Sequence, residues 1–200
     1  IGGSYVALEC SGFLTAMGFD TTAMVRSILL RGFDQQMANL IGDNMKNNGT
    51  RFIESSTPEK IEKLDDGKLR VFYNTKGETH TEEFDTVMFA TGRKPETATL
   101  NIKNLGVQMD KVGKVIVDKN DQSSVPNIFA IGDVVSGSLE LTPVAIQQGK
   151  LLVNRLYKNQ TRSLNDEMIP TTIFTPLEYG SIGYSEEDGL DFFCSPNFSY

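Results

Sequence analysis

The chain opens on a turn of small residues that leads directly into a helical pattern, and this turn constrains the fold more than any other segment. Gly2, Ser4 and Ala7 occupy the positions that nucleotide-binding βαβ units keep small. The first permits a tight turn, the second lets the backbone approach a pyrophosphate, and the third lets the helix pack closely on a strand. Ala is accepted at the third position, but Ser4 departs from the usual glycine. On its own, the turn leaves two interpretations equally open: a dinucleotide site, or a glycine-rich helix start without function.

The residues after the next expected strand favour the dinucleotide site. An NAD-specific site carries Asp or Glu about 20 residues beyond the turn, where the carboxylate binds the ribose hydroxyls. This chain instead has Arg26 and Ser27 at the strand end and Arg31 shortly after. A guanidinium binds a 2′-phosphate as a planar, bidentate donor, whereas a carboxylate would repel it. The sequence therefore favours NADPH over the alternative that both arginines are solvated loop charges.

Apolar spacing predicts two helices in the first quarter of the chain. The first ends at Gly18, and its expected core face is Val6, Cys10, Phe13, Leu14 and Met17. The second is capped by Asp34 and ended by Gly49, and its expected core face is Met37, Leu40, Ile41 and Met45. Strands are expected at 21–25, 51–54, around Ile61, 69–75 and 79–84, the last three antiparallel with turns at 66–67 and 76–77.

Two continuous apolar runs, 86–90 and 128–131, are expected to be strands buried on both faces of a parallel sheet. Residues 91–95 break the pattern and mark a domain boundary. The polar stretch after it holds one short strand, at 115–117. A helix is expected to begin with Thr142 as its cap and Pro143 as its first residue. Its expected buried side is Leu152, Val153 and Leu156, and strands resume from Pro170.

The second apolar run stops at Gly132 and Asp133, which places a carboxylate at the carboxyl end of a strand. Doubly wound sheets bind ligands at that edge. Asp133 could accept hydrogen bonds from a chain of hydroxyls, and the helix from Pro143 would direct its positive end at an electron-rich ring. Taken alone, Asp133 is better interpreted as a structural residue that caps a turn.

Composition argues against several classes of protein. The chain has 19 basic and 26 acidic residues, and no cluster of Lys or Arg favours a nucleic-acid or anionic-membrane partner. No apolar stretch approaches the ~20 residues that cross a bilayer. Cys10 and Cys194 provide neither a CxxC pair nor a zinc site, and Cys10 is expected to pack in the core as a small hydrophobe. His80 is the single histidine, which excludes a multi-histidine metal site, and it is expected to be structural.

Five segments carry a resemblance to a known family: IGGSYVALEC at 1–10, VRSILLRGFD at 25–34, AIGD at 130–133, ELTPVAI at 140–146 and PTTIFTPLEYG at 170–180. They are similar to the large, animal-type thioredoxin reductases of the pyridine nucleotide–disulfide oxidoreductase family. The resemblance extends to about residue 187. Thioredoxin–glutathione reductases share these segments, and glutathione reductases resemble them less closely.

The resemblance implies a fold and a set of domains. The fold is α/β, with a Rossmann-like NADPH domain inserted in a flavoprotein that has two dinucleotide-binding domains, plus the start of an α+β interface domain. Residues 1–93 would be the NADPH domain and 94–168 the second half of the FAD domain. Residues 169–187 would begin the dimerisation domain, and 188–200 form a divergent tail.

The resemblance also assigns cofactor-binding residues by position. NADPH would be held by Gly2, Gly3, Ser4, Val6, Ala7, Arg26, Ser27, Arg31, Gly92 and Arg93, with Lys114 a further candidate. Tyr5 resembles the aromatic gate that covers the flavin, and Glu9 resembles a helix carboxylate that pairs with a lysine near the flavin; core packing and a solvated helix face are the alternatives. FAD would be held by Asp133 at its ribityl chain and by Glu140, Leu141 and Thr142 at its pyrimidine end, with Glu140 also close to the nicotinamide.

The implied function is that of an NADPH-dependent thioredoxin-disulfide reductase in cell redox homeostasis, which passes hydride from NADPH to FAD and electrons on to a disulfide. The whole protein would be a homodimer that acts on thioredoxin, without nucleic-acid or membrane partners. It would be cytoplasmic, with mitochondria as the alternative. The family's redox disulfide, His-Pro dyad and first FAD-binding half do not occur in these 200 residues, so no catalytic residue and no metal ligand is assigned. The alternatives are an inactive NADP(H)-binding module, or part of a thioredoxin–glutathione or glutathione reductase.

Overall fold

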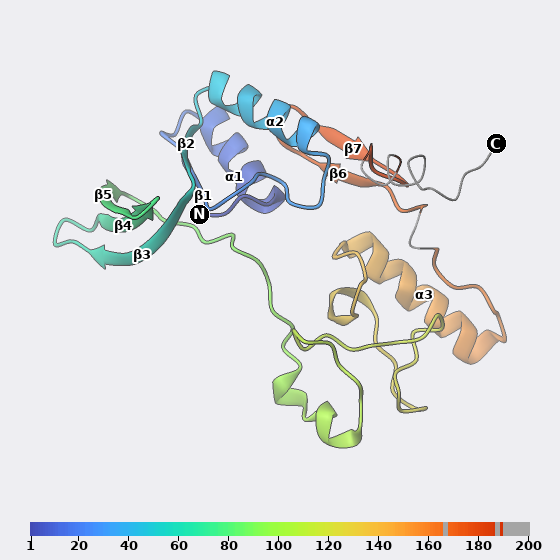
Figure 1. Ribbon diagram of the computed structural model, residues 1–200. Coiled ribbons are helices and arrows are strands. Elements are labelled where there is room, and N and C mark those ends of the chain that lie inside the picture. Colours follow the sequence, from blue (N-terminus) through green and yellow to red (C-terminus); the bar gives the residue numbers. More distant parts are fainter. Residues whose placement is uncertain (166–167, 187–188, 190–200) are drawn as a thin grey trace, which may run out of the picture. The chain divides into compact units, whose positions relative to one another are not determined.

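The computed structural model describes residues 1–165, 168–186 and 189, and these form two compact units (Figure 1). One unit comprises Ile1–Gly92 together with the chain from Pro170 onward, and the other comprises Arg93–Ile169. The assignment of 1–93, 94–168 and 169–187 to NADPH, FAD and interface domains stays a prediction. Apart from Gly189, the divergent tail with Cys194 lies outside the described residues.

The first unit is built on a β–α–β arrangement, as expected for a Rossmann-like fold. β1 (Thr22–Val25) and β2 (Arg51–Glu54) pair in parallel along their whole length. Helix α2 (Gln35–Asn47) connects them, and helix α1 (Tyr5–Ala16) precedes β1. The predicted helices and strands of this region are confirmed, with small differences at their ends.

The face of α1 that packs inward is not the predicted one. Val6, Phe13 and Met17 are exposed, Phe13 by 53% and Met17 by 68%, and Cys10 is only half-buried. The buried residues of α1 are instead Ala7, Leu8, Ser11 and Gly12. At Gly12 an added Cβ would lie 2.5 Å from Cδ of Pro176. Close approach of the backbone through small residues therefore decides the orientation of this helix, with Leu8 buried and Val6, Phe13 and Met17 facing outward.

Helix α2 buries most of the face that its apolar spacing predicts, although Leu40 is 50% exposed. It contributes three of the six buried members of one core cluster, which are Leu8, Leu30, Ala38, Ile41, Met45 and Ile173. Ile173 ends β6 (Thr171–Ile173), which pairs antiparallel with β7 (Tyr179–Ser181) beside α2 (Figure 1). The predicted return to strands after Pro170 is confirmed.

Asp34 holds the expected N-cap position of α2, but its carboxylate makes tertiary hydrogen bonds in place of a capping bond. Its Oδ2 accepts from the Tyr179 hydroxyl at 2.9 Å, and its Oδ1 accepts from the Glu186 amide at 3.2 Å. Burial, followed by this hydrogen bond, raises the pKa of Tyr179. The Asp34 side chain thus connects the segment that contains β7 to the start of α2 by hydrogen bonds.

An antiparallel meander follows β2, as predicted. Its strands are β3 (Ser56–Lys63), β4 (Leu69–Thr75) and β5 (Glu78–Phe84), in that order across the sheet. Lys76 and Gly77 join β4 to β5, with φ values of +52° and +97°. Two consecutive residues with positive φ match the right-handed twist of a tight hairpin.

A cluster of polar side chains joins this meander to the parallel pair. Arg51 of β2 forms a two-pronged ion pair with Glu82 of β5, and the Tyr73 hydroxyl donates to Glu82 at 2.6 Å. The hydrogen bond from Arg51 holds the pKa of Glu82 below its ordinary range. Burial and the bond to Glu82 raise the pKa of Tyr73 to about 12. His80 stacks on Tyr73 with ring centroids 5.4 Å apart, in line with a structural histidine.

Residues 86–90 do not form the strand that their apolar run predicted, and Phe89 is 57% exposed. Among the described residues their backbone pairs with Ile1: the Ile1 ammonium donates to the Met88 carbonyl at 2.7 Å, and the Ala90 amide donates to the Ile1 carbonyl at 2.8 Å. Pairing with one residue is too short for a ladder. The prediction of a doubly covered strand is therefore wrong for this structure.

The main element of the second unit is helix α3 (Thr142–Lys158), which begins one residue earlier than predicted. Leu141 is the N-cap, so Thr142 is the first helical residue and does not cap the helix. The buried residues are Val144, Gln148 and Leu151. Val153 and Leu156, both predicted to be buried, are 51% and 45% exposed. Short 3₁₀ turns lie at Ala98–Leu100, Ile102–Leu105 and Gly132–Val134.

The strands expected at 115–117 and 128–131 are present only as isolated bridges. Val115 bridges to two other segments and Phe129 to one, and residues 128–131 are half-buried. A strand buried in a parallel sheet needs neighbours along both edges. The described part of this unit offers single bridges, so both predictions are wrong here.

The described residues contain neither a membrane-spanning helix nor a cluster of metal ligands. None of the helices placed there is both long and apolar enough to span a bilayer. No group of three His, Cys, Asp or Glu side chains in that part of the chain could hold a metal ion.

Replacing Glu82 by Gln should remove the charge opposite Arg51 at nearly constant size. We expect a loss of about 0.5–1 kcal/mol in the free energy of unfolding at neutral pH, because the pair is partly exposed to solvent. Since the pKa of Glu82 is lowered on folding, its contribution is present above the ordinary value of 4.5 and is lost as the pH falls below it.

Urea unfolding of wild type and Glu82→Gln between neutral and acidic pH tests this expectation. The stability difference should shrink as the pH falls. The matched control is Glu59→Gln, at an exposed position of β3, which should show little difference at any pH. A difference for Glu82→Gln that stays constant with pH would contradict the assignment.

Candidate functional site

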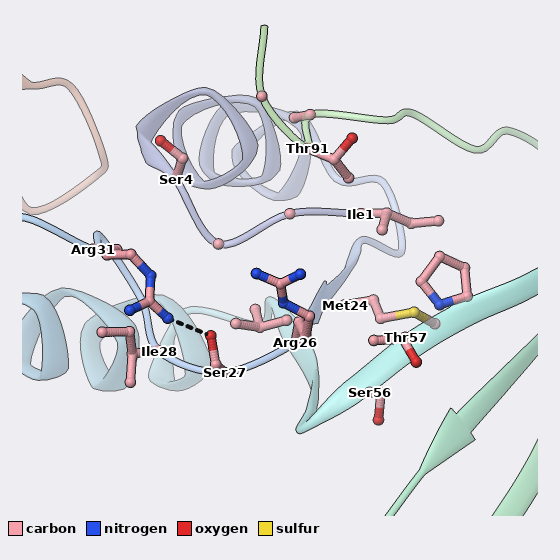
Figure 2. Close-up of a pocket in the computed structure, with 16 residues that line it drawn as sticks. Ile1, Ser4, Met24, Arg26, Ser27, Ile28, Arg31, Ser56, Thr57 and Thr91 are labelled. Atoms are coloured by element: carbon pink, nitrogen blue, oxygen red, sulfur yellow. Dashed lines mark hydrogen bonds between the residues drawn. The ribbon is translucent and has the colours of Figure 1, made fainter. Parts of the chain in front are cut away.

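A cavity of about 410 Å³ opens beside the glycine turn. Its walls come from residues 1–4, from the end of β1 and the loop after it, from the start of β3, and from residues 90–92. Figure 2 shows Arg26 and Arg31 approaching the same space, with Ser27 between them and the backbone of the turn opposite. The structure therefore brings together the turn and the two arginines, as the sequence predicted.

The glycines of the turn are required by close backbone contacts. Gly2 has a φ of +143°, and a Cβ there would lie 2.3 Å from the Ala90 carbonyl oxygen. A Cβ at Gly3 would lie 3.0 Å from the Ile28 carbonyl oxygen. The turn is thus held between two other backbone segments, and side chains at these positions would force the segments apart.

Residues 26–31 form the loop after β1. Hydrogen bonds join this loop to the glycine turn and also join residues within the loop. The Leu30 amide donates to the Gly3 carbonyl at 2.7 Å, and the Leu30 side chain is fully buried in the core cluster. The Arg31 guanidinium donates to the Ser27 hydroxyl at 2.9 Å (Figure 2). We call residues 26–31 the arginine loop. These contacts hold the loop in place relative to the glycine turn.

The charge of the cavity is positive. No Asp or Glu lines it, and in the described part of the chain neither Arg26 nor Arg31 forms an ion pair with a carboxylate. Two guanidinium groups without a counter-charge attract an anion such as a phosphate. A carboxylate that would bind ribose hydroxyls is not found at this position.

The start of α1 adds donors to the same cavity. Ser4 is the N-cap residue, its hydroxyl makes no capping hydrogen bond, and the first turn of α1 holds no acidic residue. The amides of this turn are therefore not satisfied by side-chain caps, and they carry the positive end of the helix dipole. A pyrophosphate could accept hydrogen bonds there. The departure from glycine at Ser4 leaves this end open, because the Ser4 side chain is exposed.

The other predicted residues of α1 lie away from the cavity. Ala7 is buried beneath the turn, whereas Val6 is exposed. Tyr5 is half-buried and packs against the core cluster. The Glu9 carboxylate accepts a hydrogen bond from the Phe174 amide at 2.8 Å. The flavin-related roles of Tyr5 and Glu9 stay predictions.

The remaining candidates divide between the two units. Gly92 lines the cavity with a φ of +120°, and Arg93, which is exposed, begins the second unit. In the second unit Lys114 donates to the Glu140 carboxylate at 2.6 Å, a contact that the sequence did not predict. Leu141 caps α3 and Thr142 begins it, directly after this pair.

Asp133 is exposed in a 3₁₀ turn that is held by a buried glutamine. Oε1 of Gln148 accepts from the Gly132 amide at 2.7 Å, and Nε2 of Gln148 donates to Ser138 at 3.3 Å. The Asp133 carboxylate is thereby presented to solvent on a fixed backbone, as a group that binds hydroxyls would require. Its role in FAD binding stays a prediction.

Sequence reasoning missed the wall formed by Ser56, Thr57 and Pro58 at the start of β3. A signal for it existed. β1 and β2 are parallel, so their carboxyl ends meet at the same edge, and the residues that follow β2 must lie near the arginine loop. Thr91 was missed as well, although it lies between Ala90 and Gly92 in the cavity wall.

Substituting Gly2 by Ala should destabilise the first unit more than the same change at an open glycine. Gly67 is the matched control, because it also has positive φ, +90°, but an added Cβ would have no neighbour within 4 Å. We expect a loss of about 1 kcal/mol for Gly67→Ala from backbone strain, and roughly 2–3 kcal/mol for Gly2→Ala from strain plus the clash with Ala90. Equal losses in urea unfolding would show that the turn does not depend on this close contact.

Comparison with known proteins gives a consistent result. The model of the family described as pyridine nucleotide-disulphide oxidoreductase matches residues 1–149. Thioredoxin reductase SEP1 of Emiliania huxleyi is 45% identical over 199 residues, which cover 95% of this chain and 40% of that protein. The chain thus spans less than half the length of this relative. The family model covers the glycine turn and the arginine loop, and the chain belongs to the pyridine nucleotide–disulfide oxidoreductase family, in which it is thioredoxin reductase-like.

Proposed function

We propose that the cavity beside the glycine turn binds NADP(H). Arg26, Ser27 and Arg31 would bind the 2′-phosphate, and the start of α1 would bind the pyrophosphate. The observation that carries this proposal is the pair of arginines, which face a cavity without any acidic residue. A site for NAD would need a carboxylate for the ribose hydroxyls at this place.

The residues present fit the cofactor in two further respects. At Gly2 and Gly3 the cavity is lined by backbone, and side chains at these positions would crowd its wall. The bond between Arg31 and Ser27 holds a hydroxyl and a guanidinium side by side, so a phosphate could accept hydrogen bonds from both. Hydrogen bonds to charged groups contribute about 1.5–3 kcal/mol each, enough to discriminate between a phosphate and a hydroxyl.

For the whole protein we infer an NADPH-dependent thioredoxin-disulfide reductase that contains FAD. When bound, the nicotinamide supplies hydride and the flavin accepts it before electrons reach a disulfide. In the second unit, Asp133 would accept hydrogen bonds from the ribityl hydroxyls. Lys114 would hold the Glu140 carboxylate in place beside the start of α3. We also propose that the whole protein is related to the large, animal-type enzymes and forms a homodimer. It would act on thioredoxin, in the cytoplasm or in mitochondria.

A second function is favoured by one observation, the state of the cysteine that the structure describes. Cys10 is free and half-buried on α1, and it does not line the cavity. The described part of the chain places no disulfide beside the cavity, and on this basis the 200-residue chain would act as an NADP(H)-binding module without disulfide reduction. Both proposed functions include binding of NADP(H), and only the first includes catalytic reduction of a disulfide.

Replacing Arg26 and Arg31 by Gln should weaken NADP⁺ far more than NAD⁺. Each substitution removes a charge-assisted contact to the 2′-phosphate, so we expect at least about tenfold weaker NADP⁺ binding per arginine and an NAD⁺ affinity unchanged within about twofold. Calorimetric titration of the purified chain measures both. Arg70→Gln is the matched control, because Arg70 is a partly exposed arginine paired with Glu83 on the meander. Equal losses for both dinucleotides would show that the arginines do not bind the phosphate.

Mixing the purified 200-residue chain with NADPH and oxidised thioredoxin separates the two functions. We expect a colourless protein that binds NADPH but does not oxidise it, because its electrons have no disulfide to reach. NADPH absorbance and the flavin spectrum are the measurements, with a complete thioredoxin reductase as the positive control. A yellow preparation that reduces thioredoxin would place the reductase activity in this chain.

A further inference from the structure

We propose that Gln35 is a positioning residue for the arginine loop and that it sets the preference for a 2′-phosphate without touching the ligand. This inference rests on the proposed function, in which the loop binds that phosphate. Gln35 is the first residue of α2 and does not line the cavity. Its effect on the ligand would therefore pass through the backbone.

The Gln35 side-chain amide lies among three carbonyl oxygens. Its Nε2 donates to the carbonyl of Phe33 at 2.9 Å, to that of Leu29 at 3.3 Å and to that of Leu30 at 3.4 Å. Only the NH₂ end of an amide matches such a set of acceptors, and it offers two protons, so the contacts are shared. One side chain thus contacts three carbonyl oxygens of the bend between β1 and α2, of which the Leu30 oxygen also accepts from the Phe33 amide.

The bend needs such a donor because of its backbone conformation. Leu30 has a φ of +46° and Gly32 a φ of +91°, so the chain turns sharply in the left-handed region. For a leucine this conformation is unfavourable and persists only where surrounding contacts fix it. Three further contacts fix the bend. The Leu30 amide donates to the Gly3 carbonyl, and the Phe33 amide donates to the Leu30 carbonyl at 3.0 Å. Leu29 packs so tightly on Gly42 that a Cβ there would lie 2.5 Å from its Cδ1.

The strained residue is the one that precedes the ligand-binding arginine. Arg31 follows Leu30 directly, and its bond to Ser27 spans the same bend. If Leu30 relaxed to negative φ, the backbone at Arg31 would rotate, and Arg31 and Ser27 would no longer lie side by side. Gln35 opposes this rotation because it belongs to α2, and α2 is held in place by its packing in the core cluster.

The chain offers a matched control next to this residue. Gln36 has the same side chain on the same helix, but it is exposed, and no hydrogen bond of its side chain is seen. Gln35→Met removes the amide protons at nearly constant length, and Gln36→Met makes the same change where no role is expected. Gln35→Glu is a second test variant, because it keeps the shape but turns an oxygen toward the three carbonyls.

The experiment measures binding of adenosine 2′,5′-bisphosphate and of adenosine 5′-monophosphate to the 200-residue chain by calorimetry, with circular dichroism as the check of folding. For Gln35→Met and Gln35→Glu we expect bisphosphate binding to weaken by about fivefold to tenfold, with the monophosphate unchanged within about twofold. Gln36→Met should match wild type for both ligands.

Three results would overturn the inference: unchanged bisphosphate affinity in both Gln35 variants, equal loss of both ligands, or failure of both variants to fold. Equal loss or unfolding would mean that the amide supports the structure generally and has no part in selectivity. The failure of the proposed function has a different signature. In that case wild type itself would show no preference for the bisphosphate over the monophosphate.

Discussion

The hydrogen bond between the Leu30 amide and the Gly3 carbonyl is the contact on which the rest of the candidate site depends. It joins the glycine turn to the arginine loop at 2.7 Å, and Gly3 allows the close approach, because a Cβ there would lie 3.0 Å from the Ile28 carbonyl oxygen. A second hydrogen bond, from the Gly2 amide to the Met24 carbonyl at 2.9 Å, joins the turn to the end of β1. Together the two bonds bring the amides at the start of α1 and the guanidinium groups of the loop to one cavity.

Packing below the site keeps this contact in place. Leu30 is both the donor of the bond and a fully buried member of the core cluster, so the loop cannot move without exposing apolar surface. The same cluster contains Ile173 from β6, more than a hundred residues along the chain. Asp34 and Glu9 add polar links to this C-terminal segment, through Tyr179 and the Phe174 amide. The segment after Pro170 therefore supports the helices that flank the candidate site.

The sequence predicted the site better than it predicted the packing. Small residues in the turn and arginines after β1 are local signals, because the spacing along one chain determines where they meet in a βαβ unit. Which face of α1 is buried is not a local property. Phe13 and Met17 satisfy the helical period as well as Leu8 does, and the close approach of Pro176 to Gly12 decides between the two faces. The same kind of error occurs on α3, where Gln148 is buried and Val153 is exposed.

The sequence by itself determined the order of helices and strands from α1 to β5, the position of the glycine turn and the positive charge of the loop opposite it. These follow from the period of apolar residues, the conformational freedom of glycine and the fixed charge of arginine. Only the tertiary structure decided that residues 86–90 and 128–131 are not strands, because a strand requires partners that no local pattern supplies. It also decided that Gln35 faces three carbonyls while Gln36 is exposed to solvent, since that distinction depends on how the chain bends before α2.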